Sequence, residues 1–177
     1  MWFVINVKPG LEEQAVELLR SAPETDGVRE VFCPMAVGER KERGEYVAQT
    51  LPMFDGCAFA IAPSKWELRR AVRHADGIGG LLEGDRGFEP MEDGEGAFIS
   101  EFAEPGTRTV AMSEAVVRKG GGLTVTSGPL KGYEQEICKR SGRARWAYLD
   151  TRVAGKPRHA RLGLRVTKND SPQPCEQ

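Results

Sequence analysis

Basic side chains are concentrated in one part of this chain of 177 residues. Residues 118–168 carry 13 lysines and arginines against three acidic residues, a formal charge of +10, whereas residues 1–117 carry 12 basic and 21 acidic side chains, or −9. Cations this densely placed repel one another, and a bound polyanion relieves that repulsion and releases counterions from its phosphates. The charge distribution predicts that residues 118–168 bind RNA, with an acidic protein as the alternative partner.

Two groups of cations are candidates for phosphate contact. Lys65, Arg69 and Arg73 recur every four residues, which places them on one face of a predicted helix. A solvated helix surface is the alternative for this group. The second group has few acidic neighbours in sequence and consists of Arg143, Arg145, Lys156, Arg158 and Arg161. Trp146 and Tyr148 alternate beside it, and we expect them to pack inside a small barrel rather than to stack on bases.

No arrangement of residues predicts catalysis. His74 and His159 fall in different predicted domains, and neither has a serine or cysteine nearby in a nucleophile-elbow context. The glycines near residue 79 do not follow a strand in G-x-G-x-x-G order, so no dinucleotide loop is predicted. The four cysteines are far apart and form no C-x-x-C pair, which favours reduced thiols over a zinc site. We therefore expect no enzymatic activity, no cofactor and no metal.

The first part of the chain predicts a mixed set of elements. β-branched and aromatic runs indicate strands, apolar residues spaced by three and four indicate helices, and Ser64 with Glu67 forms a capping box before the second helix. The charged segment 38–44 is predicted as a hairpin tip. The predicted strands are 2–7, 29–37, 45–54 and 57–62, and the predicted helices are 11–21, 65–74 and a weaker one at 89–103. Residues 110–117 are either the last strand of this domain or the start of the linker.

The second part predicts a small all-β unit. A strand at 123–127 is followed by a turn on Gly128-Pro129, a second turn point at Gly132 and a second strand that ends at Ile137. Further strands are predicted at 143–149, 158–164 and 164–167. Three consecutive glycines predict a linker at 118–122, because such a run forms no rigid element cheaply. The fold class is therefore α+β, an antiparallel sheet with flanking helices in domain 1–117 and a barrel in domain 123–168. The segment 169–177 is predicted to be a disordered tail.

Three stretches, taken in order, resemble the NusG family of transcription elongation factors and, within it, the specialised antitermination paralogs of the LoaP type. The first is W-F-V-I-N-V-K-P-G-L-E-E at residues 2–13, and the second is L-P-M-F-D-G-C-A-F at 51–59, similar to the family's P-L-F-P-G-Y-x-F. The third, S-G-P-L-K-G-Y-E at 127–134, matches the LoaP-like form of the KOW module. Asp55, Cys57 and Gln135 depart from the family pattern, which indicates an altered polymerase-facing surface and a different backbone at the end of the KOW core.

The resemblance implies a non-enzymatic factor with an NGN-like domain and a KOW domain. It implies that an apolar patch docks on the clamp helices of the largest RNA polymerase subunit, with Trp2, Pro52, Met53 and Phe54 at the matching positions. An exposed aromatic side chain among apolar neighbours is an effective binding anchor, and we expect Phe54 to be one and Phe59 to lie in the core. The KOW domain would recruit a ribosomal protein, a termination factor or RNA, and LoaP-like members recognise a nascent RNA hairpin.

Two further expectations complete the sequence analysis. The apolar start, Met1 to Ile5, is shorter than a signal-peptide core or a membrane span, so we expect a cytoplasmic protein with no membrane partner. The competing function is that of a translation- or ribosome-associated KOW protein that binds RNA. Such a protein would need the basic barrel but would not need an acidic first domain with an aromatic patch.

Overall fold

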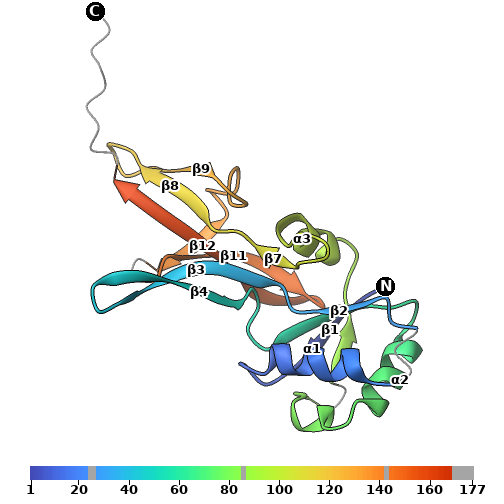
Figure 1. The fold of residues 1–177 in the computed structure, drawn as a ribbon. Coiled ribbons are helices and arrows are strands. Elements are labelled where there is room, and N and C mark those ends of the chain that lie inside the picture. Colours follow the sequence, from blue (N-terminus) through green and yellow to red (C-terminus); the bar gives the residue numbers. More distant parts are fainter. Residues whose placement is uncertain (24–26, 85–86, 142–143, 169–177) are drawn as a thin grey trace, which may run out of the picture.

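The computed structural model describes residues 1–23, 27–84, 87–141 and 144–168 (Figure 1). Within these residues the strands form three sheets. The predicted tail at 169–177 lies outside the described residues. The mixture of several sheets with few helices agrees with the α+β class that the sequence predicts.

The first sheet is antiparallel and has the order β2-β5-β1-β6. Its strands are β1 (Trp2–Asn6), β2 (Glu30–Phe32), β5 (Cys57–Ile61) and β6 (Phe88–Pro90). Side chains alternate along β1, so Phe3 and Ile5 lie in a core cluster with residues of two helices, whereas Val4 lies in the other core cluster. Both faces of this sheet are therefore covered.

The first two helices begin within one residue of their predicted starts, whereas the third begins at Glu95 rather than at residue 89, because Phe88–Pro90 pairs with β1 as strand β6. The helices are α1 (Glu12–Ser21), α2 (Lys65–His74) and α3 (Glu95–Phe102), with a short 3-10 helix η1 at Ile78–Gly80. Ser64 caps α2, since its hydroxyl accepts a hydrogen bond from the Trp66 amide at 3.2 Å and donates one to Glu67. The predicted N-cap at Ser64 is thus confirmed, and Glu67 contacts the Ser64 hydroxyl instead of the Ser64 backbone amide of a full capping box. Leu19 of α1 and Leu68 of α2 are fully buried against the first sheet.

The second sheet has the order β10-β11-β12-β8-β9, and β12 pairs antiparallel with β11 and parallel with β8. Its strands are β8 (Ser113–Val117), β9 (Leu123–Ser127), β10 (Ile137–Ser141), β11 (Trp146–Val153) and β12 (Lys156–Lys168). The two strands predicted at 158–164 and 164–167 are one long strand. The segment 110–117, predicted as the last strand of the first domain or the start of the linker, contributes β8 to the second sheet.

The glycine run at 118–122 is a hairpin turn in the structure, which differs from the predicted linker. β8 and β9 pair on either side of it, and the Arg118 amide donates to the Gly122 carbonyl at 2.9 Å. Gly120 and Gly121 have φ values of 110° and 90°, a conformation that glycine adopts at little cost. Glycine is common both in flexible linkers and in tight turns, so composition alone did not distinguish the two. The second unit therefore begins at β8.

The third sheet has the order β4-β3-β7 and joins the other two (Figure 1). It consists of β3 (Met35–Glu42), β4 (Glu45–Pro52) and the short β7 (Thr109–Val110). The hairpin tip is shorter than predicted, because the strands pair as far as Glu42 and Glu45. Only Arg43 and Gly44 form the turn, with φ values of 48° and 94° that suit a two-residue hairpin. Figure 1 shows this long ribbon lying beside β11 and β12.

Two glycines allow β3 and the second sheet to approach closely. A β-carbon added at Gly38 of β3 would lie 2.4 Å from the Trp146 ring of β11. One added at Gly163 of β12 would lie 1.9 Å from the Val37 carbonyl oxygen. Trp146 is 3% exposed, so its ring fills the space that Gly38 leaves. Each half of the chain thus supplies one glycine to the contact between them.

The Gly163→Ala variant should be less stable than the wild-type chain, because its methyl group collides with the backbone of β3. Overpacking of this kind costs about 1–3 kcal/mol, and urea unfolding of the full chain measures it. Gly122→Ala is the matched control, since a β-carbon there meets nothing within 4 Å. It should change the free energy of unfolding by less than about 0.5 kcal/mol. Equal stability of the two variants would contradict the close contact.

Candidate functional site

Met53 and Phe54 are buried in the structure, at 0% and 2% exposure, where the sequence predicts an exposed anchor at Phe54. The Phe54 ring meets Phe59 edge-on at 5.7 Å, and Phe59 stacks on Phe32 at 5.9 Å. The cluster also contains Trp146, Ala160 and Leu162 of the second sheet. The expected exposure of Phe54 is therefore wrong for this conformation, and the core position of Phe59 is confirmed. The second sheet covers Met53 and Phe54, which the local sequence pattern predicts to be exposed.

The other two residues of the predicted patch are half-buried. The Trp2 ring meets Phe32 edge-on at 5.6 Å and lies so close to Gly96 that a β-carbon there would come within 2.6 Å. Arg108 lies over the same ring at 5.8 Å. Trp2 therefore packs between the first sheet and α3. Pro52 ends β4 and accepts a hydrogen bond through its carbonyl oxygen from Arg161, at 2.9 Å.

Arg161 of β12 attaches the second sheet to the segment around Met53. Its backbone amide donates to the Met53 carbonyl at 2.8 Å. Its guanidinium donates two hydrogen bonds to the Asp55 carboxylate, at 2.8 and 2.6 Å. Such a bidentate pair fixes both position and orientation. Asp55 stands where the family pattern has a proline, so this departure from the pattern is a contact between the two halves of the chain.

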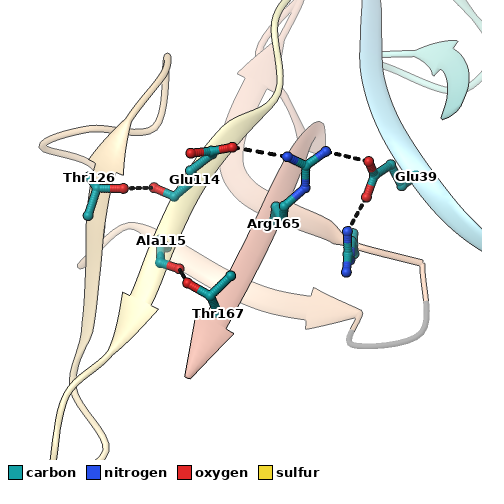
Figure 2. A network of polar contacts seen from close by, with 7 residues as sticks. Glu39, Glu114, Ala115, Thr126, Arg165 and Thr167 are labelled. Atoms are coloured by element: carbon teal, nitrogen blue, oxygen red, sulfur yellow. Dashed lines mark hydrogen bonds and ion pairs between the residues drawn. The ribbon is translucent and has the colours of Figure 1, made fainter. Parts of the chain in front are cut away.

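Glu39 of β3 binds two arginines of the second half, as Figure 2 shows. Its carboxylate accepts hydrogen bonds from Arg145 and from Arg165 of β12. Arg165 also reaches Glu114 of β8 at 3.0 Å, and Arg145 lies over the Tyr46 ring at 3.3 Å. The hydrogen bond from Arg165 lowers the pKa of Glu39, helped by Arg145 and opposed by burial. The Glu39 side chain is only 14% exposed, so water screens these pairs less than surface pairs.

A third attachment lies at the turn between β11 and β12. Lys156 forms an ion pair with Glu89 of β6 at 2.7 Å. The carboxylate of Glu95, in the first turn of α3, accepts hydrogen bonds from the amides of Ala154 and Gly155 at 2.8 and 2.9 Å. Carboxylates of the acidic half thus meet cations and amides of the basic half at three separate places.

These ion pairs neutralise some of the cations that the sequence predicts to bind RNA. Arg145, Lys156 and Arg161 bind Glu39, Glu89 and Asp55, from which they are 67 to 106 residues distant in sequence. Their contact with RNA stays a prediction, and in this conformation RNA would compete with carboxylates. Arg158 is half-buried and forms no ion pair within the described part of the chain. Arg143 lies outside the described residues.

The cations of α2 are exposed, as the predicted phosphate contact requires. Lys65, Arg69 and Arg73 all face solvent. The Trp66 side chain is 62% exposed and has the Lys65 ammonium at 5.4 Å and the Arg69 guanidinium at 5.0 Å from its ring. We call Lys65, Trp66, Arg69 and Arg73 the α2 surface. A flat aromatic ring between cations can stack on a base while its neighbours contact phosphates.

Sequence reasoning missed Trp66, although a signal was present. The buried residues of α2 and its end, Leu68, Ala71 and Ala75, follow helical spacing. Trp66 precedes Leu68 by two residues, which turns it about 200° away from that buried face. A large aromatic residue on the polar face of an amphipathic helix is unusual. The pattern of α2 thus contained the information that Trp66 is exposed.

The cysteines of the first half have no accessible chemistry. Cys33 and Cys57 are buried, and burial raises the pKa of both thiols, that of Cys57 to about 11. In the second sheet, Cys138, Asp150 and His159 bring three possible metal ligands together on an exposed face. None of the helices within the described ranges is long and apolar enough to cross a membrane.

A family model supports the resemblance to the NusG family. The family model described as "Transcription termination factor nusG" matches residues 1–99, more than half of the chain. A solved structure entitled "Domain interaction in Thermotoga maritima NusG" is similar at 17% sequence identity and a TM-score of 0.46, with 92% of each chain covered. No curated protein matches the chain.

Removing the Glu39 carboxylate should destabilise the fold in a pH-dependent way. Because the folded-state pKa of Glu39 is lowered, its contribution is complete above its ordinary value of 4.5 and is lost as pH falls through the folded-state pKa. The difference in unfolding free energy between wild type and Glu39→Gln should therefore be constant from about pH 7 to 5.5 and shrink at lower pH.

Urea unfolding between pH 7 and pH 3 measures this difference. Glu42→Gln is the control, because the Arg40–Glu42 pair is about half exposed and such pairs contribute little. A Glu39→Gln difference that stays the same down to pH 3 would show that the carboxylate charge is not what holds β3 to the second sheet.

Proposed function

The chain belongs to the NusG family, and on that premise we propose that it is a transcription elongation factor that binds RNA polymerase and suppresses pausing or termination on selected operons. The observation that carries this proposal is the family match over residues 1–99, which include Trp2 and the segment from Pro52 to Phe54. The LoaP-like run at 127–134 supports the more specific antitermination role.

Polymerase docking through Met53 and Phe54 requires the second sheet to move away. Both side chains are buried, and a side chain without exposed surface cannot contact a partner. The contacts that close over them are partly apolar, through Trp146, Ala160 and Leu162. The others are polar, namely Arg161 with Asp55, the arginines with Glu39 and Lys156 with Glu89. Water can replace the pair of Lys156 with Glu89 at modest cost, since exposed ion pairs contribute little net stability. The apolar contacts and the less exposed pairs of Glu39 therefore set most of the cost of opening. We therefore take this conformation to be a closed form in equilibrium with an open form. Polymerase would bind the open form and shift the population toward it.

Contact with nascent RNA is proposed for the α2 surface. α2 packs through Leu68 on the face of the first sheet opposite to the one that the second sheet covers. RNA can therefore reach the α2 surface without breaking the ion pairs of Arg145, Lys156 and Arg161. Trp66 supplies a stacking ring, and Lys65 and Arg69 lie beside it. The likeness to LoaP-type paralogs favours a hairpin as the ligand.

Opening the closed form should strengthen polymerase binding. Asp55→Asn removes a pair whose Asp55 side chain is 59% exposed, so affinity for a clamp-helix fragment should rise only about two- to fivefold. Gly163→Ala should have a larger effect, because its clash acts on the backbone of β3. In that background, Phe54→Leu should lower the affinity, since it keeps an apolar side chain but removes the ring. Fluorescence anisotropy with the labelled fragment measures all three.

Glu42→Gln is the control for charge removal and should leave the affinity unchanged. If no variant binds the fragment, the proposal that polymerase docks on Met53 and Phe54 is wrong. Transcription through a terminator, with purified polymerase and the full chain, tests the effect itself. Increased read-through supports the proposal, and increased termination contradicts it.

The α2 surface should bind RNA by stacking and by charge together. Trp66→Ala should weaken hairpin binding roughly 5- to 150-fold, which corresponds to 1–3 kcal/mol of base stacking, and should leave the salt dependence unchanged. Replacing Lys65, Arg69 and Arg73 by glutamine should reduce the slope of log affinity against log salt by about 2, from three phosphates. Filter binding at several salt concentrations measures both effects.

Two control variants make the RNA experiment specific. Trp66→Phe keeps an aromatic ring and should retain most of the affinity. Replacing Lys41 and Arg43 at the β3–β4 tip removes exposed cations elsewhere and should leave the slope nearly unchanged. If the tip variant behaved like the α2 variant, the binding would be non-specific attraction to positive charge.

A further inference from the structure

Three potential metal ligands lie on one exposed face of three adjacent strands. Asp150 of β11 is directly opposite His159 of β12, and their carboxylate oxygen and Nδ1 are 2.8 Å apart. The Sγ atom of Cys138, on β10, is 3.9 Å from the same Nδ1. All three donor atoms lie within 4.8 Å of one another. Neighbouring strands are about 4.8 Å apart, so paired side chains on one face converge in this way.

A backbone irregularity accompanies the position of Cys138. The register between β10 and β11 shifts between Ile137 and Lys139, so Cys138 has no opposite residue. Bulges of this kind turn a side chain away from the direction that regular pairing would give it. The cysteine that the bulge redirects has its sulfur beside His159 and within hydrogen-bond distance of the Tyr148 carbonyl, at 3.2 Å.

The donor set is that of a zinc site. Thiolate sulfur, imidazole nitrogen and carboxylate oxygen all bind Zn²⁺, at about 2.3, 2.0 and 2.0–2.2 Å respectively. Donors arranged tetrahedrally at those distances are about 3.3–3.8 Å apart. The observed separations of 2.8 and 3.9 Å differ from these by about half an ångström or less. Because all three side chains are exposed, small rotations can make up the difference.

We propose that Cys138, Asp150 and His159 form a Zn²⁺ site with three protein ligands and one open position. The open position faces solvent, because all three ligands are exposed, and His159 also lines a pocket of about 250 Å³ beside Met53, Asp55 and Arg161. The ion would cross-link β10, the edge strand of the second sheet, to β11 and β12. The sequence did not predict the site, since its ligands have no C-x-x-C or H-x-x-H spacing.

Cobalt substitution tests the site in the full reduced chain without a histidine tag. Wild-type protein should bind one Co²⁺ per chain and show a thiolate-to-cobalt charge-transfer band with the strong visible absorption of tetrahedral cobalt. Zn²⁺ should displace the cobalt. Cys138→Ser should abolish the band, and Asp150→Asn and His159→Asn should each weaken Zn²⁺ affinity, measured calorimetrically, by more than roughly 100-fold. Loss of an outer-shell partner alone costs about 10- to 100-fold.

Matched variants separate this site from adventitious binding. Cys175→Ser removes a thiol outside the described residues, and His74→Asn removes the other histidine of the chain. Both should keep the band and the affinity. Circular dichroism checks that each variant is folded. The proposal is wrong if wild-type protein gives no thiolate band, if the band survives in Cys138→Ser, or if it disappears in Cys175→Ser.

Discussion

The contact between β3 and β12 is the interaction on which the arrangement of the molecule depends. Two glycines bring the strands together, and Glu39 holds arginines from the second half across the same contact. The aromatic cluster around Phe54 is closed from one side by residues of the second sheet. Without this contact, Phe54 and Trp146 would face water, and Glu39 and its arginines would be solvated ions. Apolar burial and charge pairing therefore depend on each other here, since neither forms unless the strands approach.

The opposite charges of the two halves have an internal explanation in this fold. Residues 1–117 and 118–168 carry −9 and +10, and the observed ion pairs join the two groups. A charge imbalance within one segment is thus not by itself a signature of an external polyanion. The cations of α2 are a better indication of an outside ligand, because they belong to the acidic half and remain exposed around a tryptophan.

Local patterns predicted the elements of this fold, and contacts distant in sequence decided the rest. α2 spans Lys65–His74 as its capping box and apolar spacing indicate, and β9 begins and ends where the turn residues place it. The position of β8 depended on β12, about 50 residues later, which no local signal reports. Likewise, an apolar side chain such as Phe54 suits a partner surface and the chain's own core equally well. The partners of Arg145 and Arg161 could not be predicted either, because they are distant in sequence.

The chain passes from the third sheet to the second within a very short distance. β7 ends at Val110, in the third sheet, and β8 begins at Ser113, in the second, so only two residues connect them. A tether this short keeps the halves at an effective concentration on the order of millimolar or higher. A protein partner that binds Met53 and Phe54 therefore competes with the second sheet, which is always present because it belongs to the same chain. Its success depends on its own local concentration, which is highest when another part of the same chain has already brought it to the complex.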